Sequence, residues 1–259
     1  MIKTILNPKM YNVSLAGVVL LVCVQAVDAG TIGYWRFENG LADGIQLPET
    51  TNDVADSSGL SNHGTLDSVA NQVFSESGPG DIFGTTIHQT GASNTRSIRI
   101  DGEGAVDIPS IDFGSGSNAY TLEFWMKHTS PSGFEDLFMT ESPNEVGRGN
   151  NHGLHLNQTG DFQMFGNDGG ILPWEGSAPP LNQWIHVALT QNGSSTFELF
   201  LDGVSQGTRT DSFHFNGLTI GHTDEQYGGF LDEVRVSDQV LLPSQFLSPP
   251  ATFKDGFEK

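Results

Sequence analysis

The stretch Trp184-Ile-His-Val-Ala-Leu-Thr-Gln-Asn-Gly-Ser-Ser-Thr-Phe-Glu-Leu-Phe-Leu-Asp-Gly203 decides the fold of this chain. Two runs, 185–190 and 196–201, are rich in β-branched, aliphatic and aromatic residues, and a polar segment with an Asn-Gly pair joins them. Along each run the large apolar side chains recur at every second position, which is the period of a strand. We therefore predict an antiparallel hairpin. Because an isolated hairpin is only marginally stable in water, its apolar face needs a second sheet.

Short strand-like runs separated by turn residues continue along the rest of the chain. The strongest, 120–127, is apolar on both faces, which predicts a central strand. Segment 68–95 has little periodicity and is interpreted as a long ordered loop, and residues 242–247 as one helical turn. Roughly a dozen short strands without an amphipathic helix predict an all-β, two-sheet antiparallel sandwich that forms a single domain over residues 30–248.

The first 29 residues have the pattern of a secretory signal peptide. Lys3 and Lys9 give a basic start, 13–24 is apolar, and Val-Asp-Ala precedes a cleavage point after Ala29. The alternative is a membrane anchor, but the apolar run is shorter than the roughly 20 residues of a membrane span. We therefore expect a secreted or periplasmic protein whose mature chain begins at Gly30, and a loose C-terminal tail over 249–259.

Cysteine content and charge exclude several classes of function. Cys23, in the leader, is the only cysteine, so the mature chain has no disulfide, thiolate metal site or cysteine nucleophile. The formal net charge of −20 repels phosphate backbones and anionic lipid, which argues against nucleic-acid and membrane-surface partners. The acidity indicates either a soluble extracellular protein or, if carboxylates cluster, a site for a hard cation.

Seven motifs in order resemble one family. They are Tyr-Trp-Arg-Phe-Glu at 34–38, Asp-Ser-Ser-Gly with Asn-His-Gly-Thr-Leu at 56–66, Ile-Arg-Ile-Asp-Gly at 98–102, Tyr-Thr-Leu-Glu-Phe-Trp-Met-Lys at 120–127, Trp-Ile-His-Val-Ala-Leu-Thr at 184–190, Leu-Phe-Leu-Asp-Gly at 199–203 and Phe-Leu-Asp-Glu-Val-Arg-Val at 230–236. Together they resemble the laminin G-like domains of the concanavalin A-like lectin/glucanase superfamily, in the form found in secreted bacterial proteins. The resemblance implies a jelly roll of two curved sheets and leaves the function open.

No motif for catalysis is present. The Glu-x-Asp-x-x-Glu strand motif of related glycosidases, with both carboxylates on one face, is missing, as is a Gly-x-Ser-x-Gly elbow. The pairs Glu135-Asp136 and Asp232-Glu233 are adjacent, so we expect their side chains on opposite faces of a strand. His155 and His186 lie within apolar runs and are interpreted as structural. The sequence therefore predicts a protein that is not an enzyme.

The tryptophans divide into two groups. Trp35, Trp125 and Trp184 lie within strand-like runs and are predicted to be core residues. Trp174 lies in a polar loop rich in glycine and proline, where its indole could stack on a sugar ring. The alternative is that Trp174 folds back on the sheet as a lid. We predict Trp174 as the ligand-binding residue.

Oxygen-rich segments predict a calcium site at one rim of the sandwich. Ca²⁺ takes six to eight oxygen ligands from carboxylates, amides, carbonyls and water. Glu38 follows the first strand, Asp56, Asn62 and His63 lie in one tight loop, and Asp232 lies in the last strong strand. The first and last strands of a jelly roll commonly lie close together, and the resemblance implies a calcium ion here. Carboxylates of Glu38, Asp56 and Asp232, with carbonyl oxygens of Asn62 and His63, are the predicted ligands.

The sequence thus favours a secreted, non-catalytic laminin G-like domain that binds a glycan or an extracellular protein and holds calcium. A structural or adhesive extracellular protein without a small ligand is the first alternative. A divergent polysaccharide hydrolase or lyase is the second.

Overall fold

The computed structural model describes residues 30–39, 44–46, 53–66, 72–76, 82–100, 105–108, 111, 118–139, 153–165, 171–210, 217–221, 225 and 227–248. The predicted leader, 1–29, and tail, 249–259, lie outside these residues. No helix in this described part of the chain is long and apolar enough to cross a membrane.

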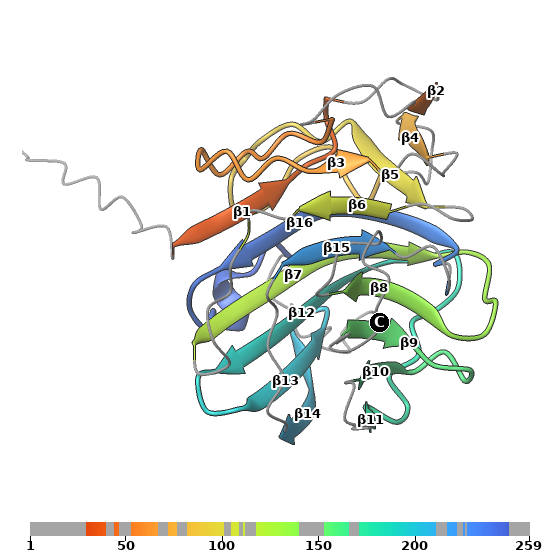
Figure 1. Ribbon diagram of the computed structural model, residues 1–259, viewed down its shortest axis with the longest axis vertical. Coiled ribbons are helices and arrows are strands. Elements are labelled where there is room, and N and C mark those ends of the chain that lie inside the picture. The colour runs from red at the N-terminus through yellow and green to blue at the C-terminus, as the bar shows by residue number, and fades with distance from the viewer. Residues whose placement is uncertain are drawn as a thin grey trace, which may run out of the picture.

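Regular structure in the described residues is almost entirely β-strand (Figure 1). The strands are β1 (Thr31–Trp35), β2 (Gly44–Gln46), β3 (Thr65–Leu66), β4 (Gln72–Glu76), β5 (Arg96–Ile100), β6 (Ala105–Ile108), β7 (Ala119–His128), β8 (Glu135–Met139), β9 (Gly153–Leu156), β10 (Phe162–Phe165), β11 (Ile171–Pro173), β12 (Trp184–Asn192), β13 (Thr196–Leu201), β14 (Val204–Thr210), β15 (Leu218–Gly221) and β16 (Gly229–Ser237). A 3₁₀ turn at Pro243–Gln245 lies within the predicted helical segment.

The strands form two sheets. The nine-stranded sheet has the order β14-β13-β12-β7-β16-β5-β4-β2, with β1 also paired to β16, and the seven-stranded sheet has the order β11-β10-β9-β8-β15-β6-β3. All the described strand pairs are antiparallel. The predicted two-sheet antiparallel jelly-roll sandwich is confirmed.

The hairpin predicted over 184–203 is formed by β12 and β13. In its turn, the Asn192 side-chain oxygen accepts hydrogen bonds from the backbone N–H groups of Ser194 and Thr196 at 3.0 and 3.2 Å. Gly193 adopts a φ of 77°, which glycine reaches without steric cost. β12 pairs along its length with β7, and β16 is the other neighbour of β7. The predicted central position of β7 is therefore confirmed.

The core lies between the two sheets and takes alternate positions from strands such as β7 and β12. Leu122, Phe124 and Met126 of β7 are fully buried there. Phe124 meets Phe138 of β8 across the interface, with ring centroids 4.6 Å apart. Trp35 belongs to this core, as predicted. Burying each such side chain contributes about 1.5–3 kcal/mol relative to leaving it exposed.

The outer face of the nine-stranded sheet is covered by two chain segments. Residues 82–95 pack through Ile87 against Tyr34 and Leu247, and residues 241–248 pack through Phe246 against Phe200. The prediction of a continuous loop over 68–95 is wrong at 72–76, because these residues form β4 beside β5. The covered face holds the polar and aromatic groups described below.

Candidate functional site

A row of aromatic rings lies on the outer face of the nine-stranded sheet. Phe83 stacks on Trp125 of β7, with ring centroids 4.1 Å apart and planes 3° apart. Phe83 also meets Trp184 of β12 edge-on at 6.1 Å, and Phe230 of β16 lies 6.3 Å from Trp184. Trp125 is buried, as predicted, but it alternates with the β7 residues of the core between the sheets and lies under Phe83 instead. Trp184 is only partly buried on the same outer face, so its prediction as a core residue is wrong.

A pocket of about 430 Å³ opens beside this aromatic row. Its walls come from β7, the covering segment 82–95 and the C-terminal segment, and they are formed by Phe83, Gly84, Thr86, Ile87, His88, Gly91, Trp125 and Leu247. The volume lies within the range of small-molecule sites. Among the described residues the buried indole N–H of Trp125 has no hydrogen-bond partner. The pocket thus combines an apolar aromatic wall with the polar edges of Thr86 and His88.

A β-bulge changes the directions of Asp232 and Glu233. The register of β16 against β7 shifts between Asp232 and Arg235, and Glu233 has a φ of 50°, which is uncommon for a residue other than glycine. Asp232 accepts a hydrogen bond from Asn94 Nδ2 at 3.0 Å, and Glu233 accepts bonds from Tyr34 Oη and from Arg36 Nε. Both carboxyl groups therefore lie on the outer side of the sheet, and the prediction that they point to opposite faces is wrong.

Burial and mutual repulsion disfavour the charged forms of this pair. Burial raises the pKa of Asp232 well above its ordinary range, and the neighbouring Glu233 raises it further. Burial also raises the pKa of Glu233, to about 7, although the hydrogen bond from Tyr34 and the Arg36 guanidinium oppose the rise. The negative charge of Glu38 adds to both shifts. Glu38, Asp232 and Glu233 therefore share one electrostatic environment.

Asn94 brings a further oxygen to this environment. Its amide nitrogen donates to Asp232, while its buried Oδ1 has no hydrogen-bond partner among the described residues. The next residue, Thr95, donates its backbone N–H to Glu38 Oε1 at 2.7 Å. Segment 94–95 thus joins two of the predicted cation ligands. Sequence analysis missed Asn94, because a single asparagine after Gly-Ala-Ser is an ordinary turn signal.

The other three predicted cation ligands form a separate hydrogen-bonded loop. Each carboxylate oxygen of Asp56 accepts two hydrogen bonds, from the backbone N–H groups of Tyr34, Ser58 and Asn62 and from the Ser58 hydroxyl. His63 Nδ1 accepts the backbone N–H of Asp56 at 3.0 Å. Partial burial would raise the pKa of Asp56, but these bonds outweigh it and lower the pKa. To bind a cation, Asp56 would have to give up some of these donors.

The five predicted cation ligands do not converge on one point in the structure. The Asn62 carbonyl accepts the indole N–H of Trp35 at 2.9 Å. Glu38, Asp56, His63 and Asp232 do not supply three ligand atoms within 4.8 Å of one another; in the described part of the chain, only Asp136, His155 and Glu225 do so. The structure therefore groups Asp56, Asn62 and His63 in one loop and joins Glu38 to Asp232 through Asn94 and Thr95.

Trp174 is not the exposed platform that the sequence suggested. Its side chain is 1% exposed and packs in the main core. The indole N–H donates to the Gly207 carbonyl at 2.9 Å, and the Arg209 guanidinium lies 5.5 Å from the ring centre. A sugar could reach neither ring face without displacing these contacts. The lid alternative is the one that the structure supports.

His186 belongs to a buried charged network that anchors the C-terminal segment. His186 Nε2 lies 2.9 Å from Glu123 Oε2, Arg235 Nε donates to Glu123 Oε1 at 2.7 Å, and the Leu247 backbone N–H donates to Glu123 Oε2 at 2.7 Å. Burial would raise the pKa of Glu123, but His186 and Arg235 outweigh it and lower the pKa. This network is enclosed and holds residue 247 against β7, beside the aromatic pocket.

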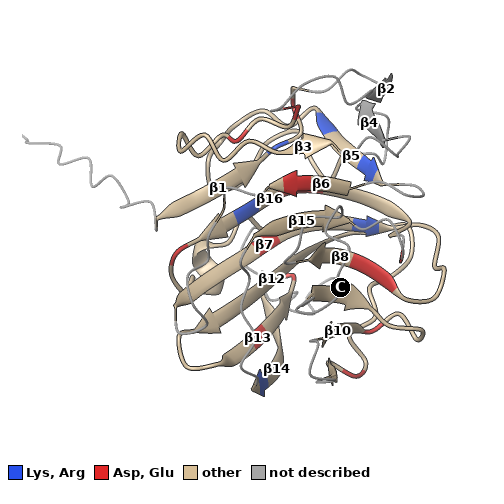
Figure 2. Cartoon of the chain, in the orientation of Figure 1, with Lys and Arg blue, Asp and Glu red and all other residues tan. Residues whose placement is uncertain are grey.

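Charged side chains are dispersed over the molecule. Figure 2 shows basic residues at separate places on strands such as β5, β14 and β16, with acidic residues among the strands between them. The net charge is −20.

The family comparison gives one match. A laminin G model, described as the concanavalin A-like lectin/glucanases superfamily, matches residues 101–245. No curated protein matches the chain.

Several solved structures share the fold. Domain 4 of an extracellular arabinanase from Geobacillus stearothermophilus, in complex with arabinotriose, has a TM-score of 0.56 and 20% identity, covering 84% of this chain and 97% of that chain. The receptor binding domain of botulinum neurotoxin D has a TM-score of 0.50 and 12% identity, covering 84% of this chain and 51% of that chain. Trypanosoma rangeli sialidase has a TM-score of 0.51 and 14% identity, covering 84% of this chain and 32% of that chain. At such identities the likeness shows the fold alone. The family model, which matches more than half of the chain, goes further: this chain belongs to the laminin G-like domains of the concanavalin A-like lectin/glucanase superfamily.

Proposed function

We propose that this chain is a secreted, non-catalytic domain that binds carbohydrate in the pocket beside Phe83 and Trp125. The carrying observation is the pocket of about 430 Å³, whose wall includes the Phe83–Trp125 stack. Aromatic rings pack well against the apolar face of a pyranose or furanose, and a few polar groups then fix its orientation. Thr86 and His88 line the same pocket and would receive the sugar hydroxyls.

The similar structures support this class of ligand. The arabinanase domain, which this chain covers almost completely, was solved with arabinotriose, and the toxin domain is described as receptor binding. Neither likeness assigns a particular sugar to this chain. Arabinotriose is nevertheless a defined first probe of the pocket.

The buried state of the carboxylates supports a non-catalytic role. Asp232 and Glu233 share one side of the sheet, but both are 0% exposed. A glycosidase needs two carboxyl groups that contact the scissile bond, and these two are enclosed by Asn94, Tyr34 and Arg36. We therefore propose that their role is structural. If the chain were instead a divergent hydrolase or lyase, it would turn over a bound polysaccharide, and Glu233→Gln would abolish this turnover.

Binding is tested first on a glycan array that includes arabino-oligosaccharides, and then by calorimetry with arabinotriose and the strongest array glycan. Phe83→Ala should raise the Kd for the glycan at least about tenfold, which corresponds to a loss of about 1.4 kcal/mol of binding free energy. Val204→Ala is the matched control, because Val204 is 55% exposed on β14 and lies outside the pocket. Its affinity should equal that of the wild type. Absence of binding to every glycan would favour the structural or adhesive alternative.

We also propose a calcium ion held by Glu38, Asp232 and the Asn94 side-chain oxygen. Two observations support the fit: Asn94 Oδ1 is buried with no partner among the described residues, and Asp232 is a buried carboxyl group beside other acidic groups. These are oxygen ligands, which Ca²⁺ prefers. A bound cation would offset the repulsion among the acidic groups. It would thereby stabilise β16 and the covering segment 82–95.

The calcium proposal is tested by thermal unfolding in Ca²⁺ and then in chelator. The wild type should melt at a higher temperature in Ca²⁺, and Asp232→Ala should remove this difference. Glu175→Ala, in an exposed loop position, is the control and should keep it. A midpoint that Ca²⁺ does not change in the wild type contradicts the site.

A further inference from the structure

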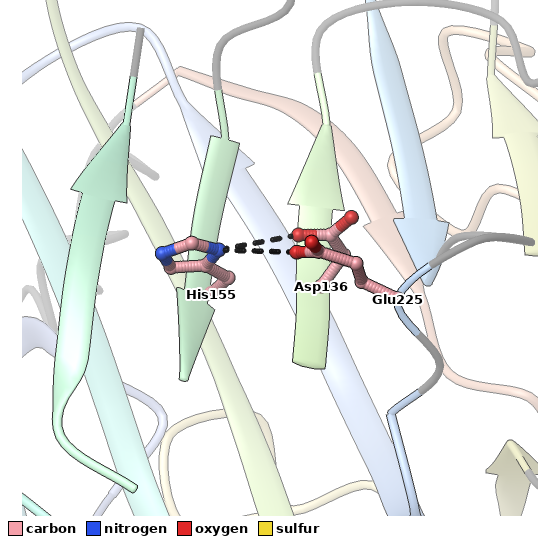
Figure 3. Close-up of side chains that lie close together, drawn as sticks. All are labelled: Asp136, His155 and Glu225. Atoms are coloured by element: carbon pink, nitrogen blue, oxygen red, sulfur yellow. Dashed lines mark ion pairs between the residues drawn. The ribbon is translucent and has the colours of Figure 1, made fainter. Parts of the chain in front are cut away.

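Asp136, His155 and Glu225 lie together outside the sites already described. Figure 3 shows their side chains pointing toward one another. Asp136 comes from β8, His155 from β9, and Glu225 from the connection between β15 and β16. One ligand atom from each lies within 4.8 Å of the other two. His155 Nδ1 is 3.4 Å from Asp136 Oδ1 and 3.7 Å from Glu225 Oε2.

The backbone holds these positions in place. Asp136 and His155 are directly opposite in the β8–β9 pair, and a bulge follows between Asp136 and Phe138. Bulges redirect side chains and are frequent near functional sites. The Asp136 backbone N–H donates to the Glu225 carbonyl at 2.7 Å, which fixes the third residue against the strand. The cluster thus does not depend on a chance meeting of long surface side chains.

His155 is a buried polar side chain whose ring nitrogens lack the hydrogen bonds that buried polar groups usually make. Its side chain is 6% exposed, and in the described part of the chain neither ring nitrogen makes a hydrogen bond. Phe134 and Phe165 hold the ring, with centroids at 5.4 and 4.5 Å. Buried polar groups almost always have a partner, and each exception needs an explanation. A metal ion facing Nδ1 would supply one.

The spacing of the ligand atoms suits a small divalent ion. In a tetrahedral site with metal–ligand distances near 2.1 Å, neighbouring ligand atoms lie about 3.4 Å apart. The two distances from His155 Nδ1, 3.4 and 3.7 Å, are close to this value. Imidazole with carboxylates suits Zn²⁺ and related transition metals, whereas Ca²⁺ and Mg²⁺ prefer oxygen ligands alone. Two carboxylates would also balance the charge of the ion.

We propose that Asp136, His155 and Glu225 form a binding site for a divalent transition-metal ion of the Zn²⁺ class. Three protein ligands leave a fourth position for water or an external ligand. The Glu225 side chain is 45% exposed, so the ion can enter from that side. His155 alternates with the core residues Leu154 and Leu156, so the site lies on the outer face of the seven-stranded sheet, whereas the proposed calcium ligand Asp232 belongs to the other sheet. It is therefore independent of both the calcium site and the sugar pocket.

The test is calorimetric titration of Zn²⁺ into the purified full chain, freed of metal and carrying no histidine tag, with Ca²⁺ titrated in parallel. The wild type should bind one Zn²⁺ more tightly than Ca²⁺ at this site. Glu225→Gln should weaken Zn²⁺ binding at least about tenfold, because even residues supporting a metal ligand change affinity by 10–100-fold. Glu175→Gln is the matched control, since it removes one exposed carboxylate elsewhere, and its Zn²⁺ affinity should not change.

Asp136→Asn tests a buried ligand, with circular dichroism and a thermal melt to establish that the variant is folded. The same folding check applies to Glu225→Gln, although its side chain is 45% exposed and the substitution keeps its size. Absence of Zn²⁺ binding in the wild type would overturn the proposal and leave an ordinary histidine–carboxylate ion pair. Equal weakening of Zn²⁺ binding by Glu225→Gln and Glu175→Gln would also overturn it. So would Ca²⁺ binding that Glu225→Gln weakens as much as it weakens Zn²⁺ binding, because the proposed calcium site at Asp232 does not include Glu225.

Discussion

Replacing Trp174 separates its two interpretations, lid and sugar platform. The indole is 1% exposed, packs in the main core and donates its N–H to the Gly207 carbonyl at 2.9 Å. A buried tryptophan removes about 200 Å² from water, which at about 25 cal/mol per Å² corresponds to about 5 kcal/mol. Partial relaxation around the cavity brings the expected cost of Trp174→Ala to about 3–5 kcal/mol. Against a total stability of about 5–15 kcal/mol this is a large loss.

Trp174→Phe separates the contribution of apolar packing to stability from that of the hydrogen bond. The phenyl ring keeps most of the apolar contact but cannot donate to Gly207, so the expected loss is about 1–3 kcal/mol. Ile171→Ala is the control in β11, the strand that ends one residue before Trp174. Because Ile171 is 61% exposed, its effect should stay within about 0.5 kcal/mol. Urea unfolding followed by circular dichroism measures all three changes.

The lid interpretation also predicts that sugar binding does not depend on the Trp174 ring. Trp174→Phe should bind the array-selected glycan with wild-type affinity. If Trp174→Ala costs less than about 1 kcal/mol while glycan binding falls more than tenfold, the reasoning is refuted and the platform reading is restored.

Three further predictions follow from the hydrogen-bond networks and the leader. Asp56→Ala should cost about 2–4 kcal/mol in urea unfolding whether Ca²⁺ or chelator is present, because four donors lose their acceptor; a cost seen only in Ca²⁺ would indicate a cation ligand instead. The pKa of Glu123 is lowered in the folded state, mainly through His186 and Arg235 acting against burial, so its stabilisation is present above the ordinary glutamate pKa and is lost as the pH falls. The stability advantage of wild type over Glu123→Gln should therefore shrink between about pH 5 and pH 3, and an advantage that grows on acidification would contradict this. N-terminal sequencing of exported protein should begin at Gly30, and an intact leader in the exported protein would disprove cleavage.

Local sequence patterns were enough for the architecture. The period of two in β12 and β13, the Asn192 turn and the doubly apolar β7 are properties of short segments, so they predicted the hairpin and the central strand correctly. The same period identifies two faces of each strand but does not say what covers the outer one. For that reason the sequence predicts Trp125 and Trp184 as core residues but does not show that Phe83 packs on both from the outer side of the sheet.

The sites depend on residues far apart in the chain and on irregular backbone. Asn94 donates a hydrogen bond to Asp232, 138 positions further along the chain. The bulge after Asp232 interrupts the alternation of side chains between the two faces of the strand. The sequence predicts Glu38 and Asp232 as cation ligands because one acidic residue follows the first strand and the other lies within the last strong strand; their role as ligands stays a proposal. The sequence predicts His155 as structural because it shows only the apolar neighbours of His155, and not Asp136 on the paired strand.

What the sequence by itself determined is the all-β sandwich and its strand directions, because side-chain alternation and turn chemistry act over a few neighbouring residues. Only the tertiary structure decided which aromatic rings face the pocket, that Trp174 is enclosed, and that Asp136, His155 and Glu225 converge. These outcomes depend on strand register, on bulges and on the paths of the covering segments. A shift of one residue in register sends each side chain of a strand to the opposite face, so no local pattern contains them.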